Sequence, residues 1–455
     1  MIVVLRGELV ELMVQVDPSL YRQYVHTTKN GTPILYMQLY KSVYGLMRSA
    51  LLFYRKLRGE LESYGFTVNP YDPCVANMMV PKPNAGTSRS GEESTTVEDP
   101  RSVGEASPDE SEMVQLTVLW HVDDLKISCV NNLEITKLLL YLKRIYGSTI
   151  SINRGQTHEY LGMTLDYSED SVFRVTMIPY IDTIMEDFPE EITKSAPSPY
   201  TENLFKTREE SDARFLDEDT AAEFRHSVAQ LLFLCYRARK DIQPAVSFLT
   251  TRLLRPDEDD WGKVRRVLRY LKGTRTLPLR LTVDDLAIAK WNIDASHAVH
   301  WDCKGQTGAG MTLGKGAVTS FSRKQKINTK SSTESEVVGV DDAMPSILWS
   351  LYFIQAQGYD MKYALVQQDN KSAILLEVNG KMSSSKRTKH IRIKYFFITD
   401  RVAQGDIVIE HKPTEEMWID MHTKPKQGTP FRKDRSQLMN CPIDIPDETK
   451  IPIST

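Results

Sequence analysis

Residues 116–130 read LTVLWHVDDLKISCV, and the rest of the chain can be organised around this stretch. Two apolar runs rich in β-forming residues, Leu116–Trp120 and Leu125–Val130, flank a polar tip that contains Asp123 and Asp124. This pattern predicts a β-hairpin with adjacent carboxylates at its turn. Two such carboxylates repel each other, and Mg²⁺, which prefers oxygen ligands, would relieve the repulsion. The alternative is a solvated turn, because Asp–Asp pairs also occur elsewhere in the chain.

Size and composition indicate a globular protein of about three domains. The chain has 455 residues, of which 26% are charged and 41% hydrophobic, and its formal net charge is −3. Any contact with nucleic acid therefore requires a local basic patch. The five cysteines are widely spaced and odd in number. They show no disulfide framework or zinc spacing, which favours a reducing, intracellular compartment. Charges at Arg6, Glu8 and Glu11 interrupt the apolar start, so we expect neither a signal peptide nor a membrane span.

Composition and periodicity predict an α+β, multidomain fold in four parts. Residues 1–188 mix strands and helices around an insertion, residues 82–112, that is acidic and almost free of apolar residues. We expect this insertion to be disordered, because it cannot bury enough surface to offset its ordering entropy. Residues 189–284 begin as a linker and continue as packed helices, residues 285–440 mix strands with helices, and residues 441–455 form a tail.

Local patterns predict individual elements along the chain. Helices are expected at residues 41–64, 132–146, 178–188, 224–236, 245–254 and 261–271, and paired strands at 160–167 and 172–177. In the last part we expect strands at 287–294, 308–313, 318–322, 363–368 and 407–411, with helices at 333–358, 370–378 and from 414. Pro345 is expected to break the first of these helices. Basic residues on helices 41–64 and 261–271 are interpreted as solvated faces, with phosphate contacts as the alternative.

Four acidic residues in the last part stand where a metal site would need them. Asp294 and Asp369 each end a predicted strand, Glu336 lies near the start of a helix, and Asp420 lies in the final helix. Four converging carboxylates can bind two Mg²⁺ ions about 4 Å apart, which suits in-line attack on a phosphodiester. Spacing alone does not show convergence, and acids at strand ends are commonly turn residues.

A basic segment, residues 383–397, reads SSSKRTKHIRIKYFF and contains no acidic residue. Bases set among aromatic rings can grip phosphates and stack on bases or sugars. The candidate nucleic-acid contacts are Lys386, Arg387, Lys389, His390, Arg392, Lys394 and Tyr395. The alternative is a lysine-rich surface loop.

Short motifs are spread over nearly the whole chain. The most specific are KSSTESE (330–336), QDNKSAI (368–374), SKRTKHIRIKYFF (385–397) and PTEEMWIDMHTKP (413–425). Others are VYGL (43–46), NPYDPCVA (69–76), YLGMTL (160–165) and RVLRYLKGT (266–274). Together they resemble the reverse transcriptase–RNase H portion of a Ty1/copia-type retrotransposon polyprotein. The first group is similar to the family's RNase H signatures, and the second to its polymerase and connection segments.

The resemblance implies a palm remnant and a helical thumb or connection region, followed by an RNase H-like domain with a mixed sheet. It implies that two Mg²⁺ ions are bound in the RNase H site by Asp294, Glu336, Asp369 and Asp420. Glu336 is preferred over Glu334, because it aligns with the second acid of the family's STEAE-like motif.

In the polymerase half, the resemblance matches Asp123 and Asp124 with the catalytic, metal-binding aspartates of a YVDD-like hairpin. His121 replaces the usual tyrosine, and Arg48 replaces the glutamine of an LYGLKQ-like segment. VVLRGEL (3–9) matches the stretch after the family's first catalytic aspartate, which would precede the first residue, and the fingers are missing too. Because a two-metal site needs carboxylates on both sides, we expect RNA-directed DNA synthesis to be lost or to need a partner chain.

The resulting hypothesis is an RNase H-type endoribonuclease that uses Mg²⁺ to hydrolyse the RNA of RNA–DNA hybrids. The expected partners are the hybrid, RNA, DNA and other chains of the same retroelement, with no membrane. The expected location is intracellular, in a cytoplasmic virus-like particle or the nucleus. One alternative is a non-catalytic nucleic-acid-binding remnant. Another is a fragment whose upstream part lies elsewhere and restores polymerase activity.

Overall fold

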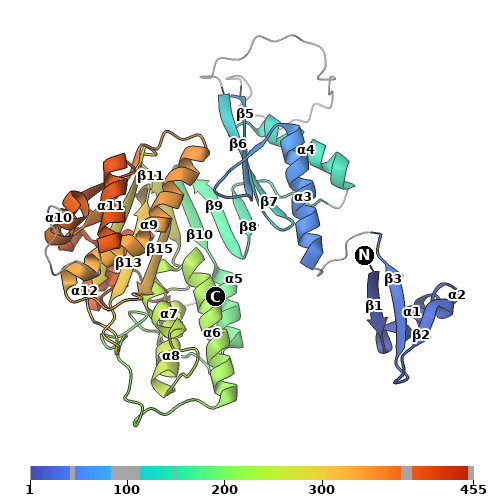
Figure 1. Ribbon diagram of the computed structural model, residues 1–455, viewed down its shortest axis with the longest axis horizontal. Helices are drawn as coiled ribbons and strands as arrows, with labels where there is room; N and C mark the ends of the chain where they lie inside the picture. Colours follow the sequence, from blue (N-terminus) through green and yellow to red (C-terminus); the bar gives the residue numbers. More distant parts are fainter. Residues whose placement is uncertain (1, 41–46, 84–112, 148–149, 381–391, 449–455) are drawn as a thin grey trace, which may run out of the picture. The chain divides into compact units, whose positions relative to one another are not determined.

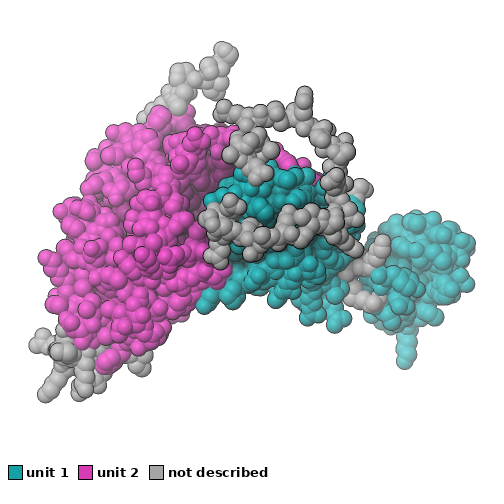
Figure 2. Space-filling view, turned by 90° about the horizontal axis from the view of Figure 1, so that it is seen from above, with its two compact units in different colours: residues 1–147 teal, residues 148–455 magenta. Residues whose placement is uncertain are grey.

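A computed structural model describes the chain except residues 1, 41–46, 84–112, 148–149, 381–391 and 449–455. The described residues form two compact units, Met1–Gly147 and Ser148–Thr455, which are coloured separately in Figure 2. Both units combine helices with sheets, so the expected α+β fold is confirmed (Figure 1). The division at residues 188, 284 and 440 stays a prediction. From residue 84 on, the predicted disordered insertion lies outside the described residues.

The first part of unit 1 is a small antiparallel sheet with the strand order β1-β3-β2. Its elements are β1 (Ile2–Arg6), α1 (Glu8–Val16), α2 (Pro18–Tyr21), β2 (Val25–Thr27) and β3 (Pro33–Gln38). Gly7 has a φ of 59°, which lets strand β1 turn directly into helix α1. Val10 and Leu35 are buried here.

The second part of unit 1 is an antiparallel sheet with the order β4-β5-β6-β7 and two helices. Its elements are α3 (Met47–Tyr64), β4 (Thr67–Val68), β5 (Val75–Pro81), β6 (Met113–His121), β7 (Asp124–Ser128) and α4 (Asn132–Tyr146). Strands β6 and β7 confirm the predicted hairpin. The two helices meet where the rings of Tyr64 and Tyr141 lie 4.7 Å apart.

Unit 2 begins with an antiparallel sheet of the order β14-β11-β10-β9-β8 and a group of helices. The strands are β8 (Thr157–Tyr160), β9 (Met163–Glu169), β10 (Val172–Thr176), β11 (Leu279–Val283) and β14 (Gly314–Lys315). The helices are α5 (Ile178–Asp187), α6 (Glu218–Arg237), η4 (Lys240–Ile242), α7 (Gln243–Thr250) and α8 (Glu258–Gly273). The predicted pairing of residues 160–167 with 172–177 is confirmed by β9 and β10. Basic residues of α8 contact the segment between α5 and α6. Arg265 pairs with Glu190, and Lys263 donates to the carbonyl of Lys206.

The remainder of unit 2 is built on a mixed sheet with the order β15-β13-β12-β16-β17. The strands are β12 (Ile288–Ser296), β13 (Gln306–Thr312), β15 (Thr319–Lys324), β16 (Tyr363–Gln368) and β17 (Ile407–His411). Strands β12, β16 and β17 are parallel, and β13 runs antiparallel to β12 and β15. The helices include α9 (Ser332–Ala356), α10 (Lys371–Asn379) and α11 (Arg392–Gln404). The mixed sheet expected from the sequence is thus confirmed.

Two local predictions in this part are wrong. Helix α9 continues through Pro345, because the loss of one backbone donor is outweighed by burial of flanking residues such as Met344 and Ile347. The helix expected from Thr414 is two short 3-10 turns, η7 (Thr414–Glu416) and η8 (Trp418–His422). Met417, with a φ of −81° and a ψ of 86°, separates the two turns, and burial of η8 side chains such as Ile419 and Met421 overrides the local preference for an α-helix. The last α-helix is α12 (Gly428–Met439).

Unit 2 contains two hydrophobic cores. The sheet core joins the mixed sheet to α9, α10 and α11, with Trp291, Ile293 and Val366 among its residues. The helical core joins α5–α8 to η8 and α12. Among the described residues, only α9 is long and apolar enough to cross a membrane by length and composition, and half of its apolar stretch is buried inside the protein.

Candidate metal centre

Three predicted acids meet at one edge of the mixed sheet. Asp294 lies on β12, Glu336 lies in the first turns of α9, and Asp369 directly follows β16. One carboxylate oxygen of each lies within 4.8 Å of those of the other two. The convergence that spacing could not show is therefore present.

The strand register brings two of these acids together. Strands β12 and β16 are parallel neighbours, and Asn292 lies opposite Gln367. Asp294 and Asp369 are each two residues further along, so strand alternation places both side chains on the same face. Asp369 is also held by Thr414, whose hydroxyl donates to its Oδ2 at 2.6 Å.

Helix α9 supplies the third acid from its capped first turns. The Ser331 hydroxyl accepts from the backbone nitrogen of Glu334 at 3.2 Å, and the Glu334 carboxylate accepts from the backbone nitrogen of Lys330 at 2.7 Å. Glu334 therefore takes part in the N-terminal cap of α9, while the carboxylate of Glu336 lies near the other two acids. Close approach of the helix to the sheet depends on Gly339, because a Cβ there would lie 3.2 Å from that of Ala295.

Asp294 and Glu336 are buried, Asp369 is half-buried, and the three charges repel one another. Burial raises the pKa of Asp294 to about 6, because the loss of hydration outweighs the attraction of Lys424. Burial, followed by the charges of Asp294 and Asp369, raises the pKa of Glu336 well above its usual value. The Glu336 Oε2 atom is buried without a hydrogen-bond partner. Converging oxygen ligands with an unsatisfied buried oxygen fit a hard divalent cation.

Asp420 lies on η8 and is joined to the cluster through a lysine. The Lys424 ammonium contacts Asp294 Oδ1 at 3.4 Å and also pairs closely with Asp420. Lys426 contacts the other Asp420 oxygen at 2.7 Å. Burial opposes ionisation of Asp420, but the two lysines outweigh it and lower its pKa. Among the described residues, the group of carboxylates close enough to share one ion does not include Asp420.

Two glycines let η8 lie directly against strand β13. A Cβ at Gly308 would lie 2.8 Å from that of His422, and one at Gly310 would lie 2.4 Å from the Trp418 ring. The next residue, Thr423, donates its hydroxyl to Asp294 Oδ2. The segment from Trp418 to Lys424 is therefore wedged between β13 and the acid cluster.

The paired acids of the β6–β7 hairpin have different surroundings. Asp123 and Asp124 are exposed, and His121 pairs with Asp124 across a two-residue turn. Val122 has a φ of 56°, an unusual conformation for a β-branched residue. Within the described parts of the chain, no group of three potential ligands includes this pair.

The basic segment is only partly described. Lys386, Arg387, Lys389 and His390 lie outside the described residues. Arg392 and Tyr395 lie in helix α11. The Lys394 ammonium pairs with Asp341 of α9. The role of this segment in nucleic-acid binding stays a prediction.

Sequence reasoning placed Thr414 only as the cap of a predicted helix and gave Thr423 and Lys424 no role. All three lie in the motif PTEEMWIDMHTKP, and each contacts one of the predicted acids. The four-residue spacing of Asp420 and Lys424 was a usable signal, because a short helical turn brings such residues together.

The strand order of the mixed sheet, with acids at one edge and α9 against it, defines an RNase H-like domain. No family model matches the chain. It is 26% identical over 398 residues to the "Retrovirus-related Pol polyprotein from transposon TNT 1-94" of Nicotiana tabacum, which covers 87% of this chain and 27% of that polyprotein. It is 30% identical over 212 residues to the corresponding polyprotein from transposon RE2 of Arabidopsis thaliana, which covers 46% and 14%. The homologues of this chain are therefore retrotransposon Pol polyproteins of the Ty1/copia type.

The chain spans less than a third of the length of either of these two relatives. Among solved structures, it is similar to the foamy viral protease-reverse transcriptase in complex with RNA/DNA hybrid. That likeness has a TM-score of 0.44 and 12% identity, and it covers 86% of this chain and 41% of the other.

Proposed function

We propose that this chain is a reverse transcriptase–RNase H fragment whose unit 2 hydrolyses the RNA strand of RNA–DNA hybrids. The observation that carries the proposal is the convergence of Asp294, Glu336 and Asp369 in an RNase H-like sheet. Relatives of the chain are retrotransposon Pol polyproteins, for which a nucleic-acid substrate is expected.

Asp294, Glu336 and Asp369 would hold the catalytic Mg²⁺, and Asp420 would join them once Lys424 shifts from between the carboxylates. When bound, a pair of Mg²⁺ ions activates water and stabilises the leaving oxygen of a phosphodiester. The protein orients the ligands: Thr414 fixes the Asp369 carboxylate, and Thr423 fixes that of Asp294. Because Glu336 and Asp294 have raised pKa values, metal binding must compete with protons at these two groups.

We further propose that unit 1 does not synthesise DNA by itself. Its exposed Asp123 and Asp124 have no third carboxylate near them among the described residues, whereas a two-metal site needs ligands from both sides. Other chains of the same retroelement would be the partners for polymerisation, in a virus-like particle or in the nucleus.

The test is cleavage of a hybrid by the purified full chain, with the RNA or the DNA strand labelled. With Mg²⁺, only the RNA strand should be cut, and a chelator should stop the cutting. A folded chain that binds the hybrid but cuts neither strand would instead be a non-catalytic nucleic-acid-binding remnant. Extension of a primer by the same preparation would refute the proposed loss of DNA synthesis.

A further inference from the structure

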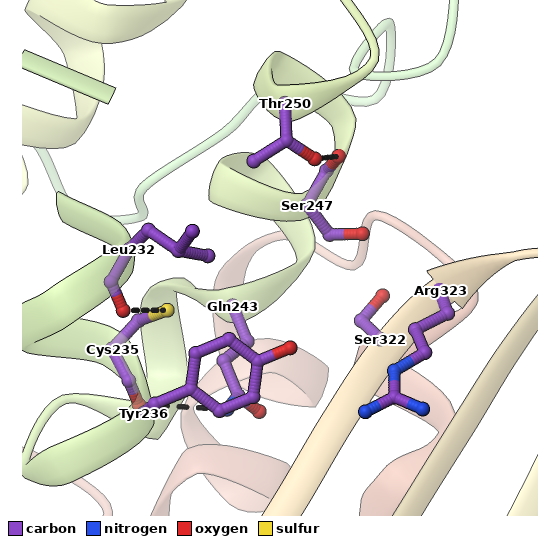
Figure 3. A pocket seen from close by; sticks show the side chains of 8 residues that line it. All are labelled: Leu232, Cys235, Tyr236, Gln243, Ser247, Thr250, Ser322 and Arg323. Atoms are coloured by element: carbon purple, nitrogen blue, oxygen red, sulfur yellow. Dashed lines mark hydrogen bonds between the residues drawn. The ribbon is translucent and has the colours of Figure 1, made fainter. Parts of the chain in front are cut away.

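Gln243 stands at the first position of α7, where the helical part of unit 2 meets the mixed sheet. Its side chain is buried and lines a cavity of about 100 Å³ with Cys235, Ser247 and Ser322 (Figure 3). Figure 3 shows Ser322 on the strand opposite the helix that carries Gln243. The glutamine therefore lies at the boundary between the helical core and the catalytic sheet.

The hydrogen bonds of Gln243 fix the orientation of its amide. Its nitrogen donates to the carbonyl of Ser320 at 2.9 Å and to that of Cys235 at 3.4 Å. Its oxygen accepts from the Ser320 hydroxyl at 2.6 Å and lies 3.0 Å from Nε2 of His422. Since the amide oxygen can only accept, His422 must carry its proton on Nε2 and donate it to Gln243.

His422 transmits this constraint to the acid cluster. The residue is fully buried, and its carbonyl also accepts from the Ser322 hydroxyl at 2.6 Å. The next two residues, Thr423 and Lys424, both contact the Asp294 carboxylate. A displacement of His422 would therefore move two groups that hold Asp294, as well as the turn that carries Asp420.

Hydrophobic packing also ties η8 to the helical core. Met417, Trp418, Ile419 and Met421 belong to the helical core, together with Phe248 of α7. The Tyr200 hydroxyl, from the segment before α6, donates to the carbonyl of Met421 at 3.3 Å. Asp294 and Glu336 lie on elements that build the sheet core. The metal centre is thus assembled from two cores, and η8 is anchored in the helical one.

We propose that Gln243 is a positioning residue for the metal centre: through His422 it holds Thr423 and Lys424 against Asp294 and fixes the place of Asp420. This inference rests on the metal site of the proposed function. It makes the helices α5–α8, which precede the mixed sheet in sequence, a component of the RNase H site rather than a spacer.

The test compares Gln243→Met with Ser247→Ala in the full chain. Met has a similar length but offers His422 only a weak thioether acceptor and has no amide donor for Ser320, whereas Ser247 lines the same cavity without contacting the histidine. Hydrogen exchange of the metal-free protein should accelerate in residues 417–424 for Gln243→Met only. Calorimetric titration with Mg²⁺ alone should show an affinity about tenfold lower for Gln243→Met, and the wild-type value for Ser247→Ala.

If Gln243→Met fails to fold, Gln243→Asn retains the amide but is too short to reach His422, and the same two results are expected. Unchanged exchange in residues 417–424 would overturn the inference, and so would faster exchange with unchanged Mg²⁺ affinity. Failure of the proposed function has a separate signature, because it would leave wild-type protein without hybrid cleavage. The exchange measurement would still decide whether Gln243 holds the turn.

Discussion

The chain carries acidic side chains in two settings that differ both in sequence spacing and in structural surroundings. Asp123 and Asp124 are neighbours in sequence and lie exposed at a hairpin tip. Asp294, Glu336 and Asp369 are far apart in sequence, yet their carboxylates meet within 4.8 Å in a largely buried place. The second arrangement suits a cation better than the first, because the protein, rather than water, surrounds most of the charges.

The difference lies in how the acids are brought together. Adjacent carboxylates in a turn can be relieved by solvent, so their proximity demands no ion. Carboxylates held together by a strand register and a packed helix cannot separate, and their repulsion remains until a cation or a proton arrives. Convergence from separate elements is thus a stronger signal than a motif of neighbouring acids.

Asp369→Asn is expected to have the largest effect on this comparison. It removes one negative ligand from the cluster and should lower RNA cleavage by about three orders of magnitude, the loss of several kcal/mol of metal-derived stabilisation. The measurement is single-turnover cleavage of a labelled hybrid. Asp360→Asn, an exposed substitution before β16, is the control and should match the wild type. Activity of Asp369→Asn near the wild-type rate would contradict the metal-site assignment.

Glu377→Gln tests a buried acid of α10 in the same unit, whose carboxylate accepts from the Gln368 amide and whose charge also acts on Glu336. Burial raises the pKa of Glu377 to about 8, against an ordinary value of 4.5. The stability contributed by its proton is therefore complete below pH 4.5 and is lost as the pH rises towards 8. Glutamine has no proton to release, so the variant should be more stable than the wild type by about 3 kcal/mol at pH 7.

Urea unfolding at pH 5 and pH 8 measures this difference. It should be small at pH 5 and largest at pH 8. Glu223→Gln, on the exposed face of α6, is the control and should show no such trend. A constant difference at both pH values would mean that Glu377 is charged in the folded chain.

Gly310→Ala tests how closely η8 packs against strand β13. The new methyl group would lie 2.4 Å from the Trp418 ring, and such overpacking should cost about 1–3 kcal/mol. Gly262→Ala on α8 meets no atom within 4 Å and should stabilise the helix by about 0.5–1 kcal/mol. Thermal unfolding of both variants gives the comparison. Equal stability of Gly310→Ala and the wild type would show that η8 moves freely away from β13.

The double substitution Asp123→Asn, Asp124→Asn should have the smallest effect on hybrid cleavage. The hairpin pair lies in unit 1, outside the acid cluster, so no measurable loss is expected in the single-turnover assay. A loss comparable to that of Asp369→Asn would remove the contrast between the two settings and would assign the hairpin to the same reaction.

Much of the fold follows from local patterns. The strands ending near Asp294 and Asp369 and the hairpin at Asp123 are encoded by alternating apolar residues and turn residues. Helix α9 through Pro345 and the 3-10 turns at Asp420 were not predicted, because burial on several sides overrides local preference there.

The candidate site was predicted less completely than the sheet that carries it. Spacing placed three acids near strand and helix ends, and the structure supplied their convergence. The link from Gln243 to His422 joins residues far apart in sequence, and a lone buried glutamine has no sequence pattern of its own. The contact of Lys424 with Asp420 is different, because the two residues are four positions apart and this spacing alone predicts a contact in a helical turn.

Strands β5 and β6 pair in continuous register from Val75 opposite Leu119 to Pro81 opposite Met113, although residues 82–112 separate them in sequence. The cost of closing a loop grows only slowly with its length. Sequence can therefore be gained or lost between these strands over generations without altering the hairpin that follows. For the laboratory, this connection is the natural place to insert an affinity tag or a fluorophore.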